Sequence, residues 1–170
     1  MIVRHNLALT HGAEFSGCMR YRYRLRRSLT GSVLERPRKP VVFLMCNPST
    51  ADSIQDDPTI RRCVGFANAW GYSDLLVSNL YAFRASTVSA LRKADDPVGP
   101  ENDDVLRAIP AGVPIVAAWG AKPWARERVR RVLELVGRPL LCLRTTRDGS
   151  PEHPLYIPQG LEPKPWSPPA

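Results

Sequence analysis

The chain has 170 residues, of which 44% are hydrophobic and 24% charged, the composition of a folded domain of ordinary size. It contains no run of 18 apolar residues, which excludes a candidate membrane-spanning helix, and its start lacks the apolar core of a signal peptide. Its four cysteines form no CxxC pair, which argues against a disulfide framework or a zinc site. We therefore expect a cytoplasmic monomer without metal or cofactor. Residues 1–158 should form one domain, and the proline-rich residues 159–170 an extended, poorly packed tail.

The net charge of +8 is concentrated near the start, because residues 1–40 hold nine arginines and lysines against two acids. Between Arg20 and Arg26 every second residue is an arginine, and a period of two predicts a strand. The arginines should then share one face, with the tyrosines and Leu25 on the other. These arginines are Arg20, Arg22, Arg24 and Arg26. Such a face suits the phosphates of a nucleic-acid backbone, although a merely solvated surface has the same pattern.

The rest of the chain alternates between apolar runs and amphipathic segments. Four runs are typical of central parallel strands buried on both faces: residues 41–46, 75–79, 114–119 and 140–143. Helices are predicted over residues 58–71, 101–109 and 123–136. This order predicts an α/β three-layer sandwich with a mainly parallel four-stranded central sheet. Helices should cover both faces, and the Arg/Tyr-rich strand should lie antiparallel at the edge.

Polar residues follow the predicted strands where each of them ends. Asn47 follows the first buried strand, Asn79 ends the second, and His153 lies in the loop beyond the last. Ligands of open parallel sheets bind at this edge, so we expect these side chains to meet in one site. Each asparagine alone would more often be a turn former, and a lone histidine before proline is more often structural.

Several short segments resemble an uncharacterised bacterial and phage family, a domain of unknown function, over about residues 18–158. They are Asn47-Pro48-Ser49-Thr50-Ala51-Asp52, Asp56-Asp57-Pro58-Thr59-Ile60-Arg61-Arg62, Trp70-Gly71-Tyr72, Asn79-Leu80, Ala118-Trp119-Gly120 and His153-Pro154-Leu155. The same landmarks are more distantly similar to the uracil-DNA glycosylase superfamily. In that resemblance Asn47-Pro48 corresponds to the catalytic loop, Asn79 to the asparagine that reads the pyrimidine edge, and Trp119-Gly120 and His153-Pro154 to two later loops.

The glycosylase resemblance implies a role for each of these residues. Asn47 would orient water near C1′, and a neutral His153 would stabilise the departing base. Asn79 would read the base edge with its donor and acceptor. No aromatic follows Asn47 closely, so Tyr81 or Phe83 would stack on the base, beside Ser49 as a further base contact. Leu155 or Tyr156 would wedge a duplex apart, as an enzyme that flips a base requires.

The acids Asp52, Asp56 and Asp57 have no counterpart in glycosylases. Their position before Pro58 predicts capping of the helix, and a magnesium site is the alternative. Arg61 and Arg62, in the first turn, should be solvated or contact phosphate.

Three functions therefore remain open, with DNA rather than RNA as the expected partner. The first is a DNA base glycosylase acting on a damaged or modified base, which would release a free base. The second is a non-catalytic binder of a modified nucleotide or nucleic acid, with salt-sensitive affinity and no product. The third is a metal-dependent nuclease or nucleotide hydrolase that uses the three acids, and a chelator would abolish its activity.

Overall fold

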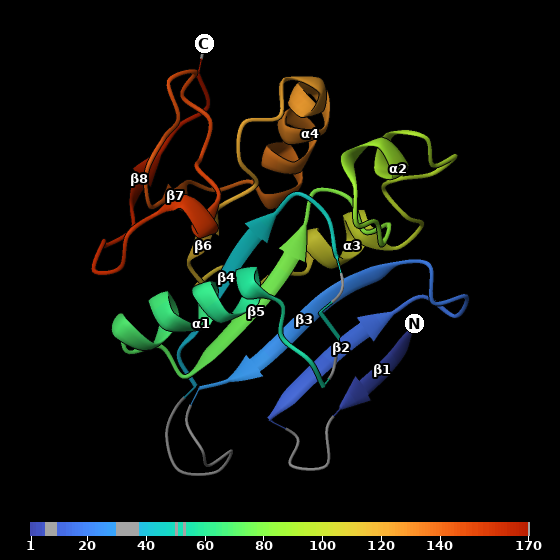
Figure 1. Ribbon diagram of the computed structural model, residues 1–170, viewed down its shortest axis with the longest axis horizontal. Helices are drawn as coiled ribbons and strands as arrows, with labels where there is room; N and C mark the ends of the chain where they lie inside the picture. The colour runs from blue at the N-terminus through green and yellow to red at the C-terminus, as the bar shows by residue number, and fades with distance from the viewer. Residues whose placement is uncertain (6–9, 30–37, 50, 53, 170) are drawn as a thin grey trace.

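The centre of the sheet consists of four parallel strands. In the computed structural model, which describes residues 1–5, 10–29, 38–49, 51–52 and 54–169, β4 (Pro40–Met45) lies between β5 (Asp74–Asn79) and β6 (Ile115–Ala117). The fourth, β7 (Leu140–Cys142), pairs with β6. These strands are the four apolar runs, so the predicted parallel centre is confirmed. In Figure 1 the arrowheads of β4 and β5 point to the same end of the sheet.

The sheet extends beyond this centre on both sides, with antiparallel strands. Next to β5 lie β3 (Arg22–Ser28), β2 (His11–Phe15) and β1 (Ile2–His5), and β8 (Lys164–Trp166) pairs with β7. The single sheet has eight strands in the order β1-β2-β3-β5-β4-β6-β7-β8. The prediction of a four-stranded sheet with the Arg/Tyr strand at its edge was therefore wrong. β3 is an interior strand, because the short strands β1 and β2 continue the sheet beyond it.

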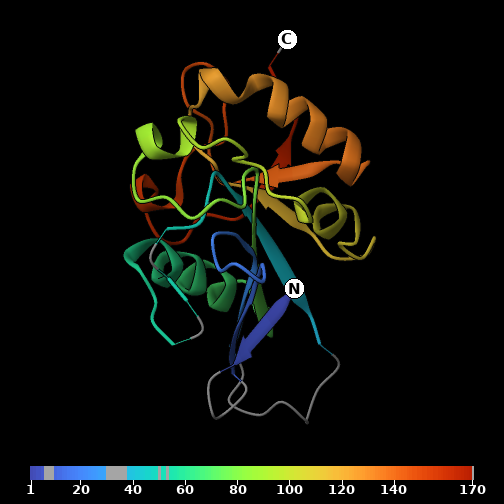
Figure 2. The ribbon, with the colours of Figure 1, turned by 90° about the vertical axis from the view of Figure 1, so that its right-hand side faces the viewer.

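The helices lie on both faces of the sheet (Figures 1 and 2). One face packs on α1 (Pro58–Ala69), and the other on α2 (Val88–Arg92), α3 (Asn102–Arg107) and α4 (Arg126–Val136). Residues of β4 alternate between the two cores, as the pleat requires: Val41 and Phe43 face α1, while Val42 and Leu44 face the other helices. Short 3-10 turns precede α4 (η1, Pro123–Ala125) and follow the last central strand (η2, Pro154–Tyr156). Among the described residues, no helix has the length and hydropathy needed to cross a membrane.

The proline-rich end contributes to the sheet. Trp166 of β8 is buried and packs edge-on against Trp119, with ring centroids 5.2 Å apart. Its indole Nε1 donates to the carbonyl of Gly149. The expectation of a poorly packed tail was wrong for this segment, because pairing with β7 satisfies the backbone despite Pro165.

Candidate functional site

A pocket of about 190 Å³ opens where β4, β5 and β6 end. Asn47, Asn79 and His153 all line it, together with Ser49 and Trp119. They meet because parallel neighbours end at one edge of the sheet: Met45 pairs with Asn79, and the loop after β7 carries His153. The volume lies below the roughly 300 Å³ at which sites for drug-sized ligands begin, so a ligand here must be small.

Asn79 presents an unpaired carboxamide to this pocket. Its residue is 1% exposed, and neither Nδ2 nor Oδ1 has a hydrogen-bond partner among the described residues. Its backbone is held, because buried Asn102 of α3 donates through Nδ2 to the carbonyls of Asn79 and Leu80, each at 3.1 Å. Buried polar groups are nearly always paired, and an orphan costs about 1–3 kcal/mol. The free donor and acceptor of Asn79 therefore mark a place for a complementary ligand.

The carboxamide of Asn47 is anchored on its nitrogen side. Its Nδ2 donates to the carbonyls of Pro48, at 2.9 Å, and Ala85, at 2.8 Å. These bonds fix the orientation of the amide and leave Oδ1 as the group that accepts from a ligand or a water. Thr50, which belongs to the same loop motif, lies outside the described residues.

His153 caps the 3-10 turn η2, and this contact assigns its tautomer. Its Nδ1 accepts from the backbone N–H of Leu155 at 3.4 Å. In the neutral ring the proton then lies on Nε2, which becomes a donor. Burial lowers the pKa of His153, and the positive charge of Lys122 lowers it further, against an opposing effect of Asp57. The neutral form therefore prevails at pH 7.

Three charged residues of the pocket were not expected from the sequence: Arg22, Asp57 and Lys122. Arg22 is only 2% exposed; it donates from Nη1 to the carbonyl of Ala51, while its Nε has no partner among the described residues. Burial lowers the pKa of Arg22, and the nearby Asp57 opposes this effect; the resulting pKa is about 10, so the guanidinium stays charged at pH 7. Asp57 also caps α1, accepting at 2.8 Å from the N–H of Ile60. The predicted capping is confirmed for Asp57, which combines it with a place in the pocket.

The thiol of Cys46 also lines the pocket, but it is no nucleophile at neutral pH. Burial raises the pKa of Cys46 to about 11, and the thiolate rather than the thiol reacts.

The predicted stacking residues lie elsewhere. Tyr81 stacks on Trp124, with ring centroids 5.6 Å apart, and Phe83 packs edge-on against Tyr21. Neither lines the pocket. The chain beyond Asn79 runs along the end of β4, where Leu80 and Tyr81 donate to the carbonyls of Met45 and Cys46. The aromatic wall of the pocket is instead Trp119.

The predicted arginine face is not one surface. Arg22 is buried, Arg24 pairs with Glu14 at 3.2 Å, and Arg26 pairs with Asp74 at 2.8 Å. A register shift between Glu14 and Phe15 of β2 interrupts the alternation of β3, and such a bulge moves side chains to the other face. Arg20 alone of the four is exposed, and its guanidinium lies over Phe83 at 5.5 Å.

Arg61 and Arg62, both on α1, have structural partners outside the helix. Arg61 donates to the carbonyl of Asp56 at 2.6 Å, and Arg62 to the carbonyl of Ile157. Arg61 is exposed, whereas Arg62 is half-buried over the ring of Phe66. Arg62 thus ties α1 to the loop that carries His153.

The acids before α1 do not converge on a metal site. Asp52 accepts from the backbone N–H groups of Ile54 and Gln55, which lower the pKa of Asp52. Asp56 pairs with Arg27 at 2.7 Å. No group of three or more metal-ligating side chains is found within the part of the chain that the structure describes.

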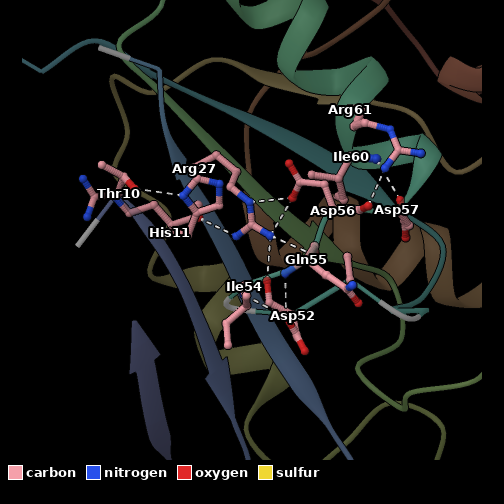
Figure 3. A network of polar contacts seen from close by, with 12 residues as sticks. Thr10, His11, Arg27, Asp52, Ile54, Gln55, Asp56, Asp57, Ile60 and Arg61 are labelled. Atoms are coloured by element: carbon pink, nitrogen blue, oxygen red, sulfur yellow. Dashed lines mark hydrogen bonds and ion pairs between the residues drawn. The ribbon is translucent and has the colours of Figure 1, made fainter. Parts of the chain in front are cut away.

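Arg27 holds this loop against the sheet (Figure 3). The residue is 1% exposed; its Nε donates to Asp56, and its Nη2 donates to the carbonyl of Asp52 at 2.6 Å. The loop leads directly to Asp57, so the Arg27 contacts position one wall of the pocket.

Replacement of Arg27 by methionine should lower the free energy of unfolding by about 2 kcal/mol, because it leaves Asp56 and a carbonyl without their donor. Arg27→Lys keeps the charge but loses the planar fork, and should recover only part of this loss. Chemical denaturation of the three proteins measures both effects. Equal stability of Arg27→Met and the parent would contradict the role given to Arg27.

Leu155 and Tyr156 follow His153 in η2. Their exposed fractions are 42% and 73%, so both apolar side chains stand on the surface beside the pocket.

Comparison with known protein families identifies the family of this chain. A family model described as "Protein of unknown function (DUF1643)" matches residues 22–155, well over half of the sequence. The chain belongs to the DUF1643 family. Comparison with curated proteins and with solved structures gave no match.

The DUF1643 match begins at Arg22 and includes His153, so it spans every residue that lines the pocket. It leaves out β1, β2 and β8. The expected membership of a family of unknown function is thus confirmed, and the site described here lies within that family's domain.

Proposed function

We propose that this protein recognises a single nucleobase and cleaves its N-glycosidic bond, as a DNA base glycosylase that acts on a damaged or modified base. The observation that carries the proposal is the unpaired carboxamide of Asn79, 1% exposed, in a pocket of about 190 Å³. An amide pairs best with a neighbouring N–H and C=O, which its Oδ1 and Nδ2 can bind together. Uracil, thymine and hypoxanthine present this edge.

The remaining pocket groups supply what bond cleavage needs. The C1′–N bond breaks with its electron pair on the base, whose carbonyl oxygen gains negative charge, and the sugar becomes cationic. His153 Nε2–H donates to that oxygen. The negative carboxylate of Asp57 stabilises the cationic sugar and accepts a proton from the water that attacks C1′. Asn47 Oδ1 orients that water.

The proposal includes a relationship to the uracil-DNA glycosylase superfamily and its three-layer sandwich. Helices on both faces of a parallel centre support it, as does the chain order of the asparagine, tryptophan and histidine loops around one pocket. DNA is the proposed partner, and the exposed Leu155 and Tyr156 are suited to fill the gap that a flipped base leaves.

Asp57→Asn should lower the rate of base release about tenfold while it keeps the cap of α1. Asparagine caps helices as well as aspartate does, so only the charge in the pocket is lost. Asp57→Ala is the contrast, since it removes the cap as well and should cost about 1 kcal/mol of stability. Single-turnover rates and denaturation curves for both variants separate the two roles. An unchanged rate in Asp57→Asn would leave Asp57 with its capping role alone.

A lesion screen tests the proposed function directly. Single-stranded and duplex oligonucleotides, each with one modified base, are incubated with the protein with and without EDTA. Mass spectrometry detects free base, and alkali cleavage detects the abasic site. Base release that is insensitive to EDTA supports the glycosylase. Base-selective binding without release would favour a binder, and strand cleavage abolished by EDTA would favour a metal-dependent nuclease.

A further inference from the structure

A second, larger cavity of about 510 Å³ adjoins the pocket. Trp119 and Lys122 line both, so the two spaces share one wall. We call this cavity the α4 groove. It runs between α4 and the C-terminal segment, which stand side by side at the top of Figure 1.

One stripe of α4 forms the first wall of the groove. Its residues follow the i, i+3, i+4, i+7 spacing of a single helix face: Arg126, Val129, Arg130 and Leu133. Arg126 and Arg130 are exposed, and no ion pair of either is found among the described residues. Arg131, on another side of the helix, pairs instead with Glu134 at 3.1 Å.

The opposite wall is apolar and well fixed. It contains Trp166, Pro168 and Pro169, and Trp166 is held by its bond to Gly149 and its contact with Trp119. Among the described residues, Asp148 is the one carboxylate that lines the groove; its Oδ1 accepts from the Thr146 hydroxyl and the Ser150 N–H. Within the described part of the chain, Lys122, Arg126 and Arg130 thus face a tryptophan and two prolines, and the carboxylate of Asp148 already has hydrogen-bond donors.

We infer that the α4 groove binds the nucleotide next to the recognised base, so that the ligand is a polynucleotide strand rather than a free nucleotide. This rests on the proposed function, which places the base in the pocket. Arg126 and Arg130 suit the phosphodiester. The exposed rings of Pro168 and Pro169, which lie next to the buried Trp166 in the chain, suit the flat face of the neighbouring base. Lys122, on the shared wall, lies where the backbone must pass from one space to the other. The volume lies within the roughly 300–1,000 Å³ of sites for larger ligands.

Binding of oligothymidylates of one, three, five and eight residues, measured by fluorescence anisotropy at several salt concentrations, tests the inference. Affinity should rise steeply from one residue to three. The double variant Arg126→Gln/Arg130→Gln should bind the trinucleotide about 20-fold more weakly at 0.1 M salt and flatten the salt slope by about 1.4, since each lost phosphate contact on a single strand changes it by about 0.7. Thymidine monophosphate should bind both proteins equally.

Arg131→Gln is the control, because it removes one charge of the same kind from the same helix outside the groove. An equal loss in this control, or no loss in the double variant, would overturn the inference. Polyglutamate of matched charge that competes as well as the oligonucleotide would also overturn it, in favour of an acidic peptide.

The failure of this inference can be told apart from that of the proposed function. If oligonucleotides bind through Arg126 and Arg130 but no modified base is selected or released, the inference about the groove is supported and the proposed glycosylase function is wrong. If a modified base is recognised equally in a nucleotide and in an oligonucleotide, base recognition by the pocket is supported and the inference about the groove is wrong.

Discussion

Replacement of Asn79 by leucine should abolish base selectivity and at the same time make the protein more stable. The amide is buried with neither polar atom paired, so its removal relieves a desolvation cost of about 1 kcal/mol or more. The ligand loses both hydrogen bonds of its recognised edge in a water-poor site, and we expect the preference for the cognate base to fall about 10³-fold. Denaturation curves and competition binding measure the two effects.

Asn102→Leu provides the opposite control, with the same substitution at an equally buried position. Asn102 donates to the carbonyls of Asn79 and Leu80, so its loss should destabilise the fold by about 2 kcal/mol. If Asn79→Leu destabilised the protein to the same extent, Asn79 would be an ordinary structural residue and its proposed role would fail. Asn79→Asp should change base choice, because one donor becomes an acceptor.

Loss of the His153 ring should slow base release by roughly 10²-fold in His153→Ala, as expected when one donor to a developing negative charge is removed. His153→Gln retains an N–H donor and should recover part of the rate. Substrate affinity should change less than the rate constant, because the contact strengthens only as the bond breaks. Single-turnover assays separate the two quantities, and equal rates for all three proteins would remove His153 from the chemistry.

The same residue should shape the acid side of the stability curve. The pKa of His153 lies below its ordinary value of 6.5 in the folded protein, so the unfolded chain binds more protons below about pH 6.5. The free energy of unfolding should therefore decrease as the pH is lowered below about 6.5. The lowered pKa of His11 acts in the same direction, so the difference between parent and His153→Gln isolates the contribution of His153.

The parallel centre of the fold was predictable because its strands are continuous apolar runs, which few structures other than buried strands accommodate. The antiparallel extension was not. Ile2–His5 and His11–Phe15 are short and mixed in composition, and only their pairing with β3 makes them strands. Without them β3 looked like an edge, and its bulge could not be inferred from an alternation that is unbroken in the sequence.

The positions of residues at strand ends could be predicted, because the direction of a parallel strand fixes the edge of the sheet at which it ends. Asn47, Asn79 and Trp119 line the pocket for this reason. Two side chains, one from a loop and one from a neighbouring strand, were not foreseen in the pocket. Arg22 reaches the pocket because the bulge redirects it, and Asp57 because Arg27 fixes its loop. Tyr81 and Phe83 come soon after β5, which ends at the pocket, but their rings pack on Trp124 and Tyr21.

The pocket is assembled from segments that lie far apart in the chain, from Arg22 on β3 to His153 beyond β7. No single helix, hairpin or short contiguous fragment contains it, so the binding surface exists only when the strands from β3 to β7 have assembled. Ligand affinity and cooperative unfolding are therefore thermodynamically linked. A ligand of this pocket would protect the entire domain rather than one loop, and a partly folded chain would retain no residual affinity for it.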